Sequence, residues 1–318
     1  MVKYLCSKFV QMIIMLFALS FVIFCALDLT GVDPIDYMVA SDIVNAIDDI
    51  ELLREELGLN GPVVSRYFSW LSEVLSGNLG YSLITGNKIT DTLSGRLSAT
   101  FELSFWALIL STTTGILIGI VSAIRQNGIV DYIGRVFSVL GQSIPQFFCG
   151  VILVQVFATS LGWLPPSGRM SPGGGGFMDR LTYLVLPVMT LTLAMTAVIM
   201  SYTRSTMLSV LNSDYIKTAR SKGIPEWKVY TQHALINAIR PVLVIVMFRL
   251  PMLVSGAVVV ETVFGWPGIG STLITAVIAG DYPIILITTL MIAVAILISS
   301  FLLDILNALL DPRIRFDE

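Results

Sequence analysis

Few residues in this 318-residue chain have the types and spacing that catalysis or metal binding requires. His233 is the single histidine, and the three cysteines, Cys6, Cys25 and Cys149, lie in or beside apolar segments. A zinc-protease motif needs two histidines, and a structural zinc site needs several His or Cys ligands close together. None of the six lysines follows a glycine, although a phosphate-binding P-loop requires Gly-Lys-Ser/Thr. We therefore expect no catalytic residue, no metal site and no cofactor in this chain.

One polar segment, residues 211–240, has instead the pattern of a docking element, and reads LNSDYIKTARSKGIPEWKVYTQHALINAIR. Asp214 or the two polar residues before it can cap a short helix, and Gly223 can adopt the left-handed conformation that ends one. Pro225 and Glu226 suit the first turn of a second helix. A short, rigid and basic helix–turn–helix unit of this kind fits a groove on another protein. The alternative is a helix that lies on anionic lipid.

The elements that flank this segment must lie in a membrane. The chain is 55% hydrophobic and only 13% charged, with a mean hydropathy of +0.84, whereas soluble domains are about 25% charged. The net charge of −3 leaves no basic surface for nucleic acid. A helix needs about 20 apolar residues to cross a bilayer. Six such runs are present, over residues 9–29, 99–124, 136–161, 181–200, 241–263 and 282–309.

The distribution of basic residues predicts the orientation of these spans. Lys3 and Lys8 precede the first apolar run, which is too long for a cleaved signal peptide, so residues 1–30 are interpreted as a retained transmembrane helix. If the N-terminus is cytoplasmic, twelve of the nineteen basic residues fall on the cytoplasmic side and six on the other. This asymmetry predicts that both termini are cytoplasmic.

The remaining segments indicate a packed bundle with a small external region. Residues 31–98 separate the first two spans and carry two amphipathic runs, over 48–57 and 63–75. Gly115 and Gly119 form a small-xxx-small pair that allows close contact between helices. Prolines also interrupt or end the apolar runs, namely Pro145, Pro187, Pro251 and Pro283. Such breaks at membrane depth are tolerated where neighbouring helices or a water-filled cavity satisfy the freed carbonyls, which favours a bundle around a pathway.

Several motifs, taken together, resemble those of one family. In the polar segment these residues are Asp214, Tyr215, Thr218, Ala219, Arg220, Gly223, His233, Asn237 and Pro241. Elsewhere they are Glu56-Leu57-Gly58-Leu59, Gly77-Asn78-Leu79-Gly80-Tyr81-Ser82, Ala99-Thr100-Phe101-Glu102-Leu103, Leu161-Gly162-Trp163-Leu164-Pro165, Trp266-Pro267-Gly268-Ile269-Gly270, Asp281-Tyr282-Pro283 and Asp311-Pro312-Arg313. The chain resembles permease subunits of ABC importers, and more narrowly those of the dipeptide/oligopeptide/nickel branch. The resemblance covers nearly the whole chain in the order of the family.

This resemblance implies an all-α membrane protein with the type I ABC importer permease fold. It implies a five-helix permease core over residues 99–310, an external region over 31–98 and a cytoplasmic tail over 311–318. Residues 211–240 then become the EAA loop, which docks on an ATPase subunit and in which Ala219 packs closely against that partner. The implied partners are a second homologous permease subunit that forms a heterodimer, two ATPase subunits that bind ATP and Mg, a solute-binding protein, and lipid. The implied location is the inner membrane of a bacterial or archaeal cell.

The pathway and its cargo are less well defined by the sequence. Arg249 is the one charge well inside an apolar run, so it should face the interior and either pair with an acid or meet an anionic cargo. Glu261 and Glu102 are further pathway candidates, although positions near the ends of spans also suit solvated or loop-anchoring roles. Peptides are the expected cargo, with nickel complexes, metallophores and glutathione as alternatives. An ion-coupled secondary transporter is the alternative of a different class, but it would usually place acids deep in the bundle.

Overall fold

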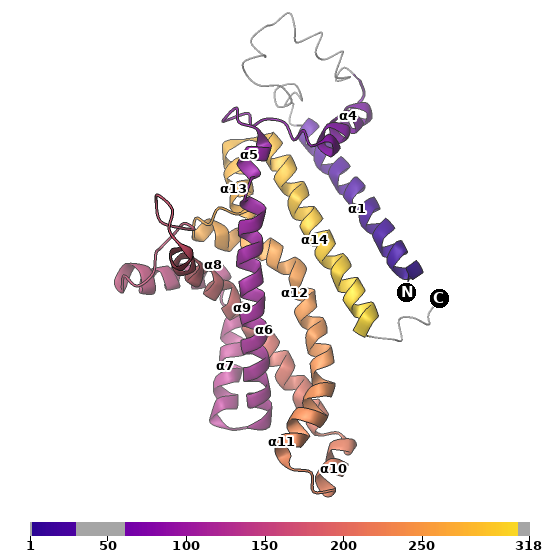
Figure 1. Ribbon diagram of the computed structural model, residues 1–318, viewed down its shortest axis with the longest axis vertical. Helices are drawn as coiled ribbons and strands as arrows, with labels where there is room; N and C mark the ends of the chain where they lie inside the picture. The colour runs from indigo at the N-terminus through magenta and orange to yellow at the C-terminus, as the bar shows by residue number, and fades with distance from the viewer. Residues whose placement is uncertain (1, 30–60, 311–318) are drawn as a thin grey trace, which may run out of the picture. The chain divides into compact units, whose positions relative to one another are not determined.

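The computed structural model describes residues 2–29 and 61–310 (Figure 1). The helix expected over residues 48–57 and the tail 311–318 lie outside the described residues. The described chain is helical, with no β-strand beyond an isolated bridge between Tyr81 and Lys88. It divides into two compact units: unit 1 comprises Met1–Thr100 and Pro267–Phe301, and unit 2 comprises Phe101–Trp266 and Leu302–Glu318.

The helices follow the apolar periodicity of the sequence. In chain order they are α1 (Val2–Asp28), α4 (Val63–Ser76), α5 (Ile89–Leu93), α6 (Arg96–Ile124), α7 (Ile129–Ser143), α8 (Gln146–Leu153), the π-helical η1 (Val154–Ser160), α9 (Phe177–Leu211), α10 (Asp214–Ser221), α11 (Glu226–Lys228), the π-helical η2 (Val229–Ala234), α12 (Leu235–Val263), α13 (Ile269–Ala279) and α14 (Tyr282–Leu310). The amphipathic helix expected over residues 63–75 is present as α4.

Among the described residues, five helical runs are long and apolar enough to cross a membrane, and a sixth candidate is a bent pair. The single runs are Tyr4–Ala26, Ile89–Ile124, Phe177–Leu211, Glu226–Pro251 and Tyr282–Leu306. The bent pair joins Ile129–Ser143 to Gln146–Ser160 at an angle of 106°.

The third span expected from the sequence, residues 136–161, is therefore not one continuous helix. The helix stops before Pro145, which has no backbone N–H to continue it. Ile144 accordingly lies in the extended region, at φ −83° and ψ 126°, as the residue before a proline prefers. Proline at this position thus separates α7 from α8.

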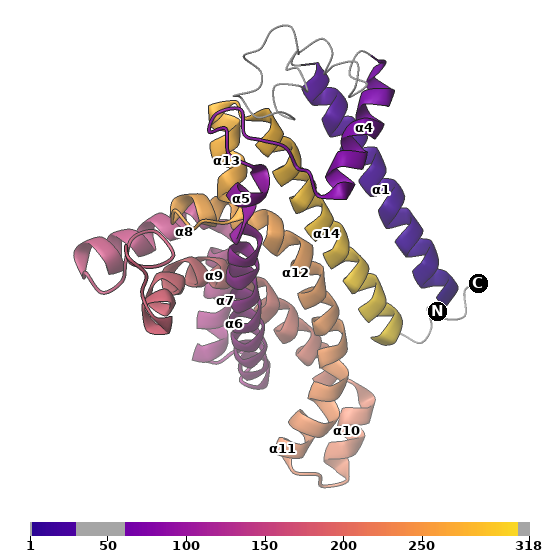
Figure 2. The same cartoon turned by 45° about the horizontal axis from the view of Figure 1, so that its top comes forward.

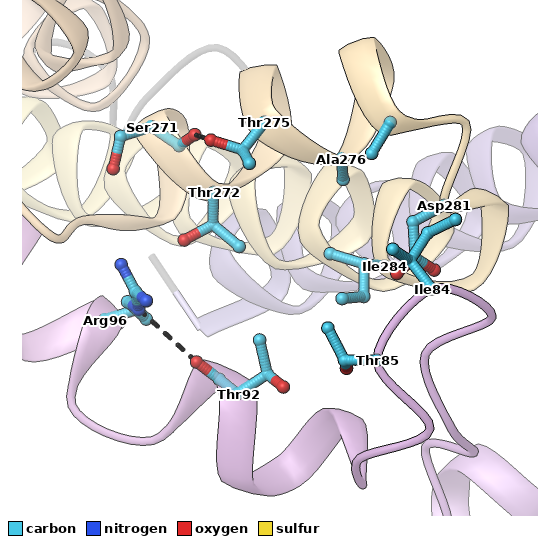
Figure 3. A pocket seen from close by; sticks show the side chains of 11 residues that line it. Ile84, Thr85, Thr92, Arg96, Ser271, Thr272, Thr275, Ala276, Asp281 and Ile284 are labelled. Atoms are coloured by element: carbon cyan, nitrogen blue, oxygen red, sulfur yellow. Dashed lines mark hydrogen bonds between the residues drawn. The ribbon is translucent and has the colours of Figure 1, made fainter.

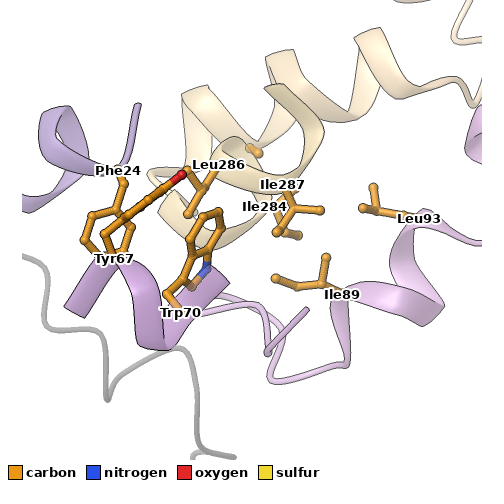
Figure 4. Close-up of a cluster of buried hydrophobic side chains, with 9 residues drawn as sticks. Phe24, Tyr67, Trp70, Ile89, Leu93, Ile284, Leu286 and Ile287 are labelled. Atoms are coloured by element: carbon orange, nitrogen blue, oxygen red, sulfur yellow. The ribbon is translucent and has the colours of Figure 1, made fainter. Parts of the chain in front are cut away.

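Unit 1 is held together by aromatic packing between α1 and α4 (Figure 4). Figures 1 and 2 show α1 running beside α14, and the rings of Phe9 and Phe301 lie 5.9 Å apart. Tyr67 of α4 packs edge-on against Phe24 of α1 at 5.6 Å, and its hydroxyl lies 2.6 Å from Ser20 Oγ. The buried tyrosine hydroxyl therefore has a polar partner, as burial in an apolar cluster requires.

Unit 2 is a bundle in which glycines let helices approach closely. A Cβ added at Gly119 of α6 would lie 2.6 Å from Thr203 Cβ of α9, and one at Gly115 would lie 2.8 Å from Ile199 Cβ. Real Cβ atoms do not come so close, so a larger residue would push α6 and α9 apart. The small-xxx-small contact expected from the sequence is confirmed.

The outward faces of the long helices are apolar. On α1, the side chains of Ile14 and Val22 are 61% and 62% exposed. Soluble monomers rarely expose continuous apolar faces of this size, so these faces suit lipid or neighbouring membrane helices.

Candidate coupling loop and charged clusters

The polar segment folds as two helices that meet at a tight turn. α9 ends at Leu211, α10 runs from Asp214 to Ser221, and the helical run that begins with α11 at Glu226 continues through η2 into α12. Figures 1 and 2 show α10 and α11 together at one end of α12. The sequence predicted the helix–turn–helix but not the π-helical turn η2, for which no residue pattern gave a signal.

The turn after α10 is a Schellman motif centred on a glycine. Gly223 has φ +74°, and its N–H donates to the carbonyl of Arg220 at 2.9 Å. The N–H of Ile224 donates to the carbonyl of Ala219 at 3.3 Å. These bonds satisfy two carbonyls that the helix end would leave free, and glycine is preferred because a Cβ disfavours positive φ.

A two-pronged ion pair fixes the second helix relative to the first. Arg220 Nε donates to Glu226 Oε1 at 2.9 Å, and Arg220 Nη2 donates to Glu226 Oε2 at 3.2 Å. The hydrogen bond to the Glu226 carboxylate raises the pKa of Arg220 above its ordinary value. Both side chains are about half exposed, so the pair contributes mainly geometry and little stability.

One face of the loop is buried within this chain. Ile216 and Val229 are fully buried with Met207 of α9 and Ala123 of α6. Ala219 is only 7% exposed, because it lies three residues after Ile216 on the same face of α10. The sequence suggested that Ala219 packs closely against a partner, but in this chain its side chain is already buried.

The opposite face of the loop is open. Tyr215 and Trp227 are 47% and 60% exposed, and Thr218 and Lys222 are also exposed. Asp214 lies in an exposed ion pair with Lys217, with 2.9 Å between Oδ1 and Nζ. We call this face the loop tip, defined by the following residues: Asp214, Tyr215, Lys217, Thr218, Lys222 and Trp227.

Two predicted coupling residues lie beside the tip, on the helical run that follows the turn. His233, in η2, is half-buried, and its carbonyl accepts a hydrogen bond from the Asn237 side chain at 2.8 Å. Asn237 itself is exposed at the start of α12. The loop therefore holds all eight predicted coupling residues on one continuous helix–turn–helix, with Arg220 and Ala219 making contacts within the chain.

The first predicted pathway residue, Glu102, forms a charged cluster with two arginines. Its Oε2 accepts from Arg169 Nη2 at 2.8 Å and from Arg180 Nη2 at 2.5 Å. Arg169 belongs to the loop before α9 and also stacks on Trp266, at 5.6 Å from the ring centroid. The loop-anchoring role considered for Glu102 thus fits the contacts that the carboxylate makes.

We expect Glu102→Gln to loosen the loop over residues 161–176. The neutral amide removes the charge that two guanidinium groups share, which costs about 1–2 kcal/mol for a partly exposed cluster. Amide hydrogen exchange in the loop should become about tenfold faster. Asp91→Asn, on an exposed residue outside the cluster, is the matched control and should leave exchange in the loop unchanged. Unchanged exchange in both variants would show that the cluster does not hold the loop.

The other two pathway residues lie far apart on α12. Arg249 is half-buried and Glu261 is fully buried. They are separated by twelve residues of one helix, which corresponds to about 18 Å along its axis. The structure therefore does not bring Arg249 and Glu261 into one site.

A second charged cluster, which the sequence reasoning missed, lies where α6, α7 and α9 meet. Asp131 is fully buried and accepts from Arg204 Nε at 2.5 Å and from Arg204 Nη2 at 2.8 Å. Its carboxylate also accepts from Ser122 Oγ at 2.7 Å and from the N–H of Asn127 at 3.0 Å. In the sequence, the available signal was that an acid, Asp131, precedes the apolar run over residues 136–161 and that an arginine, Arg204, follows the next run, over residues 181–200.

The two clusters bracket the apolar length of α6. Glu102 near its start and Ser122 near its end are twenty residues apart, or about 30 Å, which is the thickness of the hydrocarbon core. Charged groups thus gather at the two ends of the span, where membrane proteins tolerate them.

Comparison with known proteins agrees with this helical membrane fold. The family model described as binding-protein-dependent transport system inner membrane component matches residues 115–316. The model for the N-terminal part of that membrane component matches residues 1–104. The chain belongs to this family, a class of multi-pass inner-membrane permease subunits of ABC importers that are not themselves catalytic. The resemblance stated from the sequence is confirmed.

Individual relatives match over almost the full chain. A Brucella suis protein with the provisional name of peptide permease is 37% identical, covering 99% of both chains. The oligopeptide transport system permease protein AppB of Bacillus subtilis is 35% identical, and the glutathione transport system permease protein GsiC of Pectobacterium atrosepticum is 34% identical. Each of these two alignments covers 99% of this chain and all of the relative.

A solved structure supports the fold. The crystal structure of an amino acid ABC transporter with histidines superimposes with a TM-score of 0.54 at 15% identity. The match covers 75% of this chain and 97% of that one. The all-α permease fold expected from the sequence is confirmed.

Proposed function

We propose that this chain forms half of the membrane path of an ATP-driven importer for peptide-like solutes. A second, homologous permease subunit forms the other half, a solute-binding protein delivers the cargo, and two ATPase subunits bind ATP and Mg. The family and the peptide, oligopeptide and glutathione names of its relatives support this proposal. Glutathione is itself a small peptide, so a path that is suited to small peptides is also suited to glutathione.

The loop tip is the observation that carries the proposed docking to the ATPase. It presents two large exposed aromatic rings, those of Tyr215 and Trp227, on a scaffold fixed by the Gly223 turn and the Arg220–Glu226 pair. Aromatic side chains on a rigid support are typical anchors of protein interfaces. A docking surface that is already ordered loses little conformational entropy on binding.

The orientation follows from the same charge asymmetry that the sequence shows. The loop over residues 211–240 carries five lysines and arginines and lies on the cytoplasmic side if both termini are cytoplasmic. The cluster around Glu102 then lies at the outer end of α6. Movement of the ATPase subunits would reach the membrane through α9 and α12, the two long helices that leave the loop.

Site-directed cross-linking tests the docking. A chain in which the three cysteines are replaced by serine would carry one new cysteine, Lys222→Cys at the loop tip or Lys88→Cys in unit 1 as the control. A bifunctional reagent applied to inverted membrane vesicles should join the cysteine at position 222 to an ATPase subunit, and not the one at position 88. Absence of an ATPase from the complex isolated through this chain, or equal cross-linking from both positions, would contradict the proposal.

Arg249 is proposed to line the path and to meet the carboxylate of the cargo. Arg249→Gln should then raise the KM for uptake of a free dipeptide about tenfold, because a charge-assisted hydrogen bond is lost. Uptake of the same dipeptide with an amidated C-terminus should not change. Equal KM values for the free dipeptide in the two proteins would show that Arg249 has a structural role.

A further inference from the structure

Unit 1 contains a cavity, with two charged side chains in its lining, that neither the loop nor the charged clusters explain (Figure 3). Its volume is about 210 Å³, and it lies between the segment that leads into α6 and the helix α13. The residues that give it chemical character are Thr92, Arg96, Ser271, Thr272, Thr275 and Asp281. Ile84, Ala276, Ala279 and Ile284 complete the lining, so the cavity combines apolar walls with a small number of charged and hydroxyl groups, as binding sites for small molecules do.

The hydroxyl groups of the cavity are arranged as acceptors. Thr272 Oγ1 donates its proton to the carbonyl of Gly268 at 2.8 Å, and Thr275 Oγ1 donates to the carbonyl of Ser271 at 2.9 Å. A hydroxyl has one proton and two lone pairs, so these side chains can still accept hydrogen bonds. They therefore favour an occupant that brings N–H donors.

The acidic end of the cavity is held firmly. Asp281 is only 3% exposed, and its carboxylate accepts from Ser82 Oγ and from the N–H of Leu83 at 3.3 Å. A carboxylate has about four acceptor positions, so these two bonds leave capacity for a further donor. An ammonium group would complete the coordination of this carboxylate.

The basic end lies opposite. Figure 3 shows Arg96 and Asp281 at the two ends of the lining residues. Arg96 Nε donates to the carbonyl of Thr92 at 3.4 Å, and among the described residues its side chain makes no other hydrogen bond or ion pair. A guanidinium has five N–H donors, and its terminal pair matches a carboxylate.

We propose that this cavity binds a small zwitterion, a free dipeptide or amino acid, with its ammonium toward Asp281 and its carboxylate toward Arg96. The volume lies below the 300–1,000 Å³ of drug-sized sites, which suits an occupant of this size. A simple anion would use only Arg96, and a simple cation only Asp281. This inference rests on the proposed function: if the chain transports peptide-like solutes, the cavity is a cargo site in unit 1, separate from the contact proposed at Arg249.

Calorimetric titration of the dipeptide Ala-Ala tests this assignment. The full chain would be reconstituted in lipid nanodiscs with the subunits that remain bound to it, without ATP and without binding protein. Every protein in this titration, including the one called wild type here, carries Arg249→Gln, so that the carboxylate contact proposed above for Arg249 cannot contribute. In the wild type, amidation of the dipeptide C-terminus should weaken binding about tenfold, and so should acetylation of its N-terminus. In Arg96→Gln, Ala-Ala should bind about tenfold more weakly, and amidation should have no further effect. Lys88→Gln, which removes an exposed charge outside the cavity lining, is the matched control and should behave as the wild type.

Each outcome decides the proposal. Absence of Ala-Ala binding to the wild type at millimolar concentration overturns it, and so does an Arg96→Gln protein that still distinguishes the free from the amidated dipeptide. Equal weakening in Lys88→Gln also overturns it, because the effect would then be a general charge effect. A thermal unfolding midpoint for Arg96→Gln within a few degrees of the wild type shows that the variant is folded. The titration needs neither ATP nor an ATPase, so its failure is distinct from failure of the cross-linking experiment.

Discussion

Replacement of Gly223 by proline should abolish ATP-dependent uptake while the chain still reaches the membrane. Proline fixes φ near −65°, whereas Gly223 has φ +74°. Proline also removes the N–H that donates to the carbonyl of Arg220 at 2.9 Å. The turn must then open, which separates Arg220 from Glu226 and displaces the loop tip from its docking geometry. The measurement is dipeptide uptake in vesicles together with the amount of ATPase that co-purifies.

A graded series distinguishes this effect from general damage. Gly223→Ala keeps the N–H and costs only about 1–2 kcal/mol for a left-handed residue, so uptake should fall partly. Gly174→Ala also introduces a side chain at positive φ, 85°, and at both glycines no atom lies within 4 Å of the added Cβ, but Gly174 lies in the loop before α9 and outside the turn after α10. It should retain full uptake. Normal uptake by Gly223→Pro would mean that the turn does not transmit work between the ATPase and the membrane helices.

Replacement of Asp131 by alanine should produce the largest loss of stability among single changes of charge. It leaves Arg204, whose side chain is 18% exposed, without the carboxylate that accepts two of its N–H groups. Removing one partner of a buried pair costs about 3–5 kcal/mol, because the other charge remains desolvated. Unfolding of the purified chain in mixed micelles with increasing SDS measures this loss. Uptake should fall as well, since Arg204 lies seven residues before the end of α9, where the loop begins.

Two comparisons make this prediction specific. Asp214→Ala breaks the ion pair with Lys217. The side chain of Asp214 is 96% exposed and that of Lys217 is 67% exposed, so the free energy of unfolding should fall by less than about 1 kcal/mol. The double variant Asp131→Ala with Arg204→Met removes both charges and should be more stable than Asp131→Ala alone. If the double variant were no more stable than the single one, the cost would come from packing and not from the unpaired arginine.

Much of the candidate site could be predicted from local sequence. Gly223, Pro225 and Glu226 specify a helix end and a helix start by their own backbone preferences, and the structure contains both. The apolar runs specified the spans for a similar reason, because the length of a helix that crosses hydrocarbon is fixed by the bilayer. Pro145 was identified as a possible break, but the resulting angle of 106° depends on how the two halves pack.

The charged partners could not be predicted in the same way. Glu102 is 67 positions from Arg169, and Asp131 is 73 positions from Arg204, so no local pattern records these pairs. Ala219 shows the same limit, because the burial of its side chain depends on which helices cover α10.

The sequence by itself determined the membrane class and the helix–turn–helix, because hydropathy, glycine and proline act within a few residues of themselves, and its motifs indicated the family by resemblance. Tertiary structure alone decided which charges pair, which face of the loop stays open, and that Arg96 and Asp281 share one cavity. These features arise where segments distant along the chain meet, and burial makes each unpaired charge costly enough to select one arrangement.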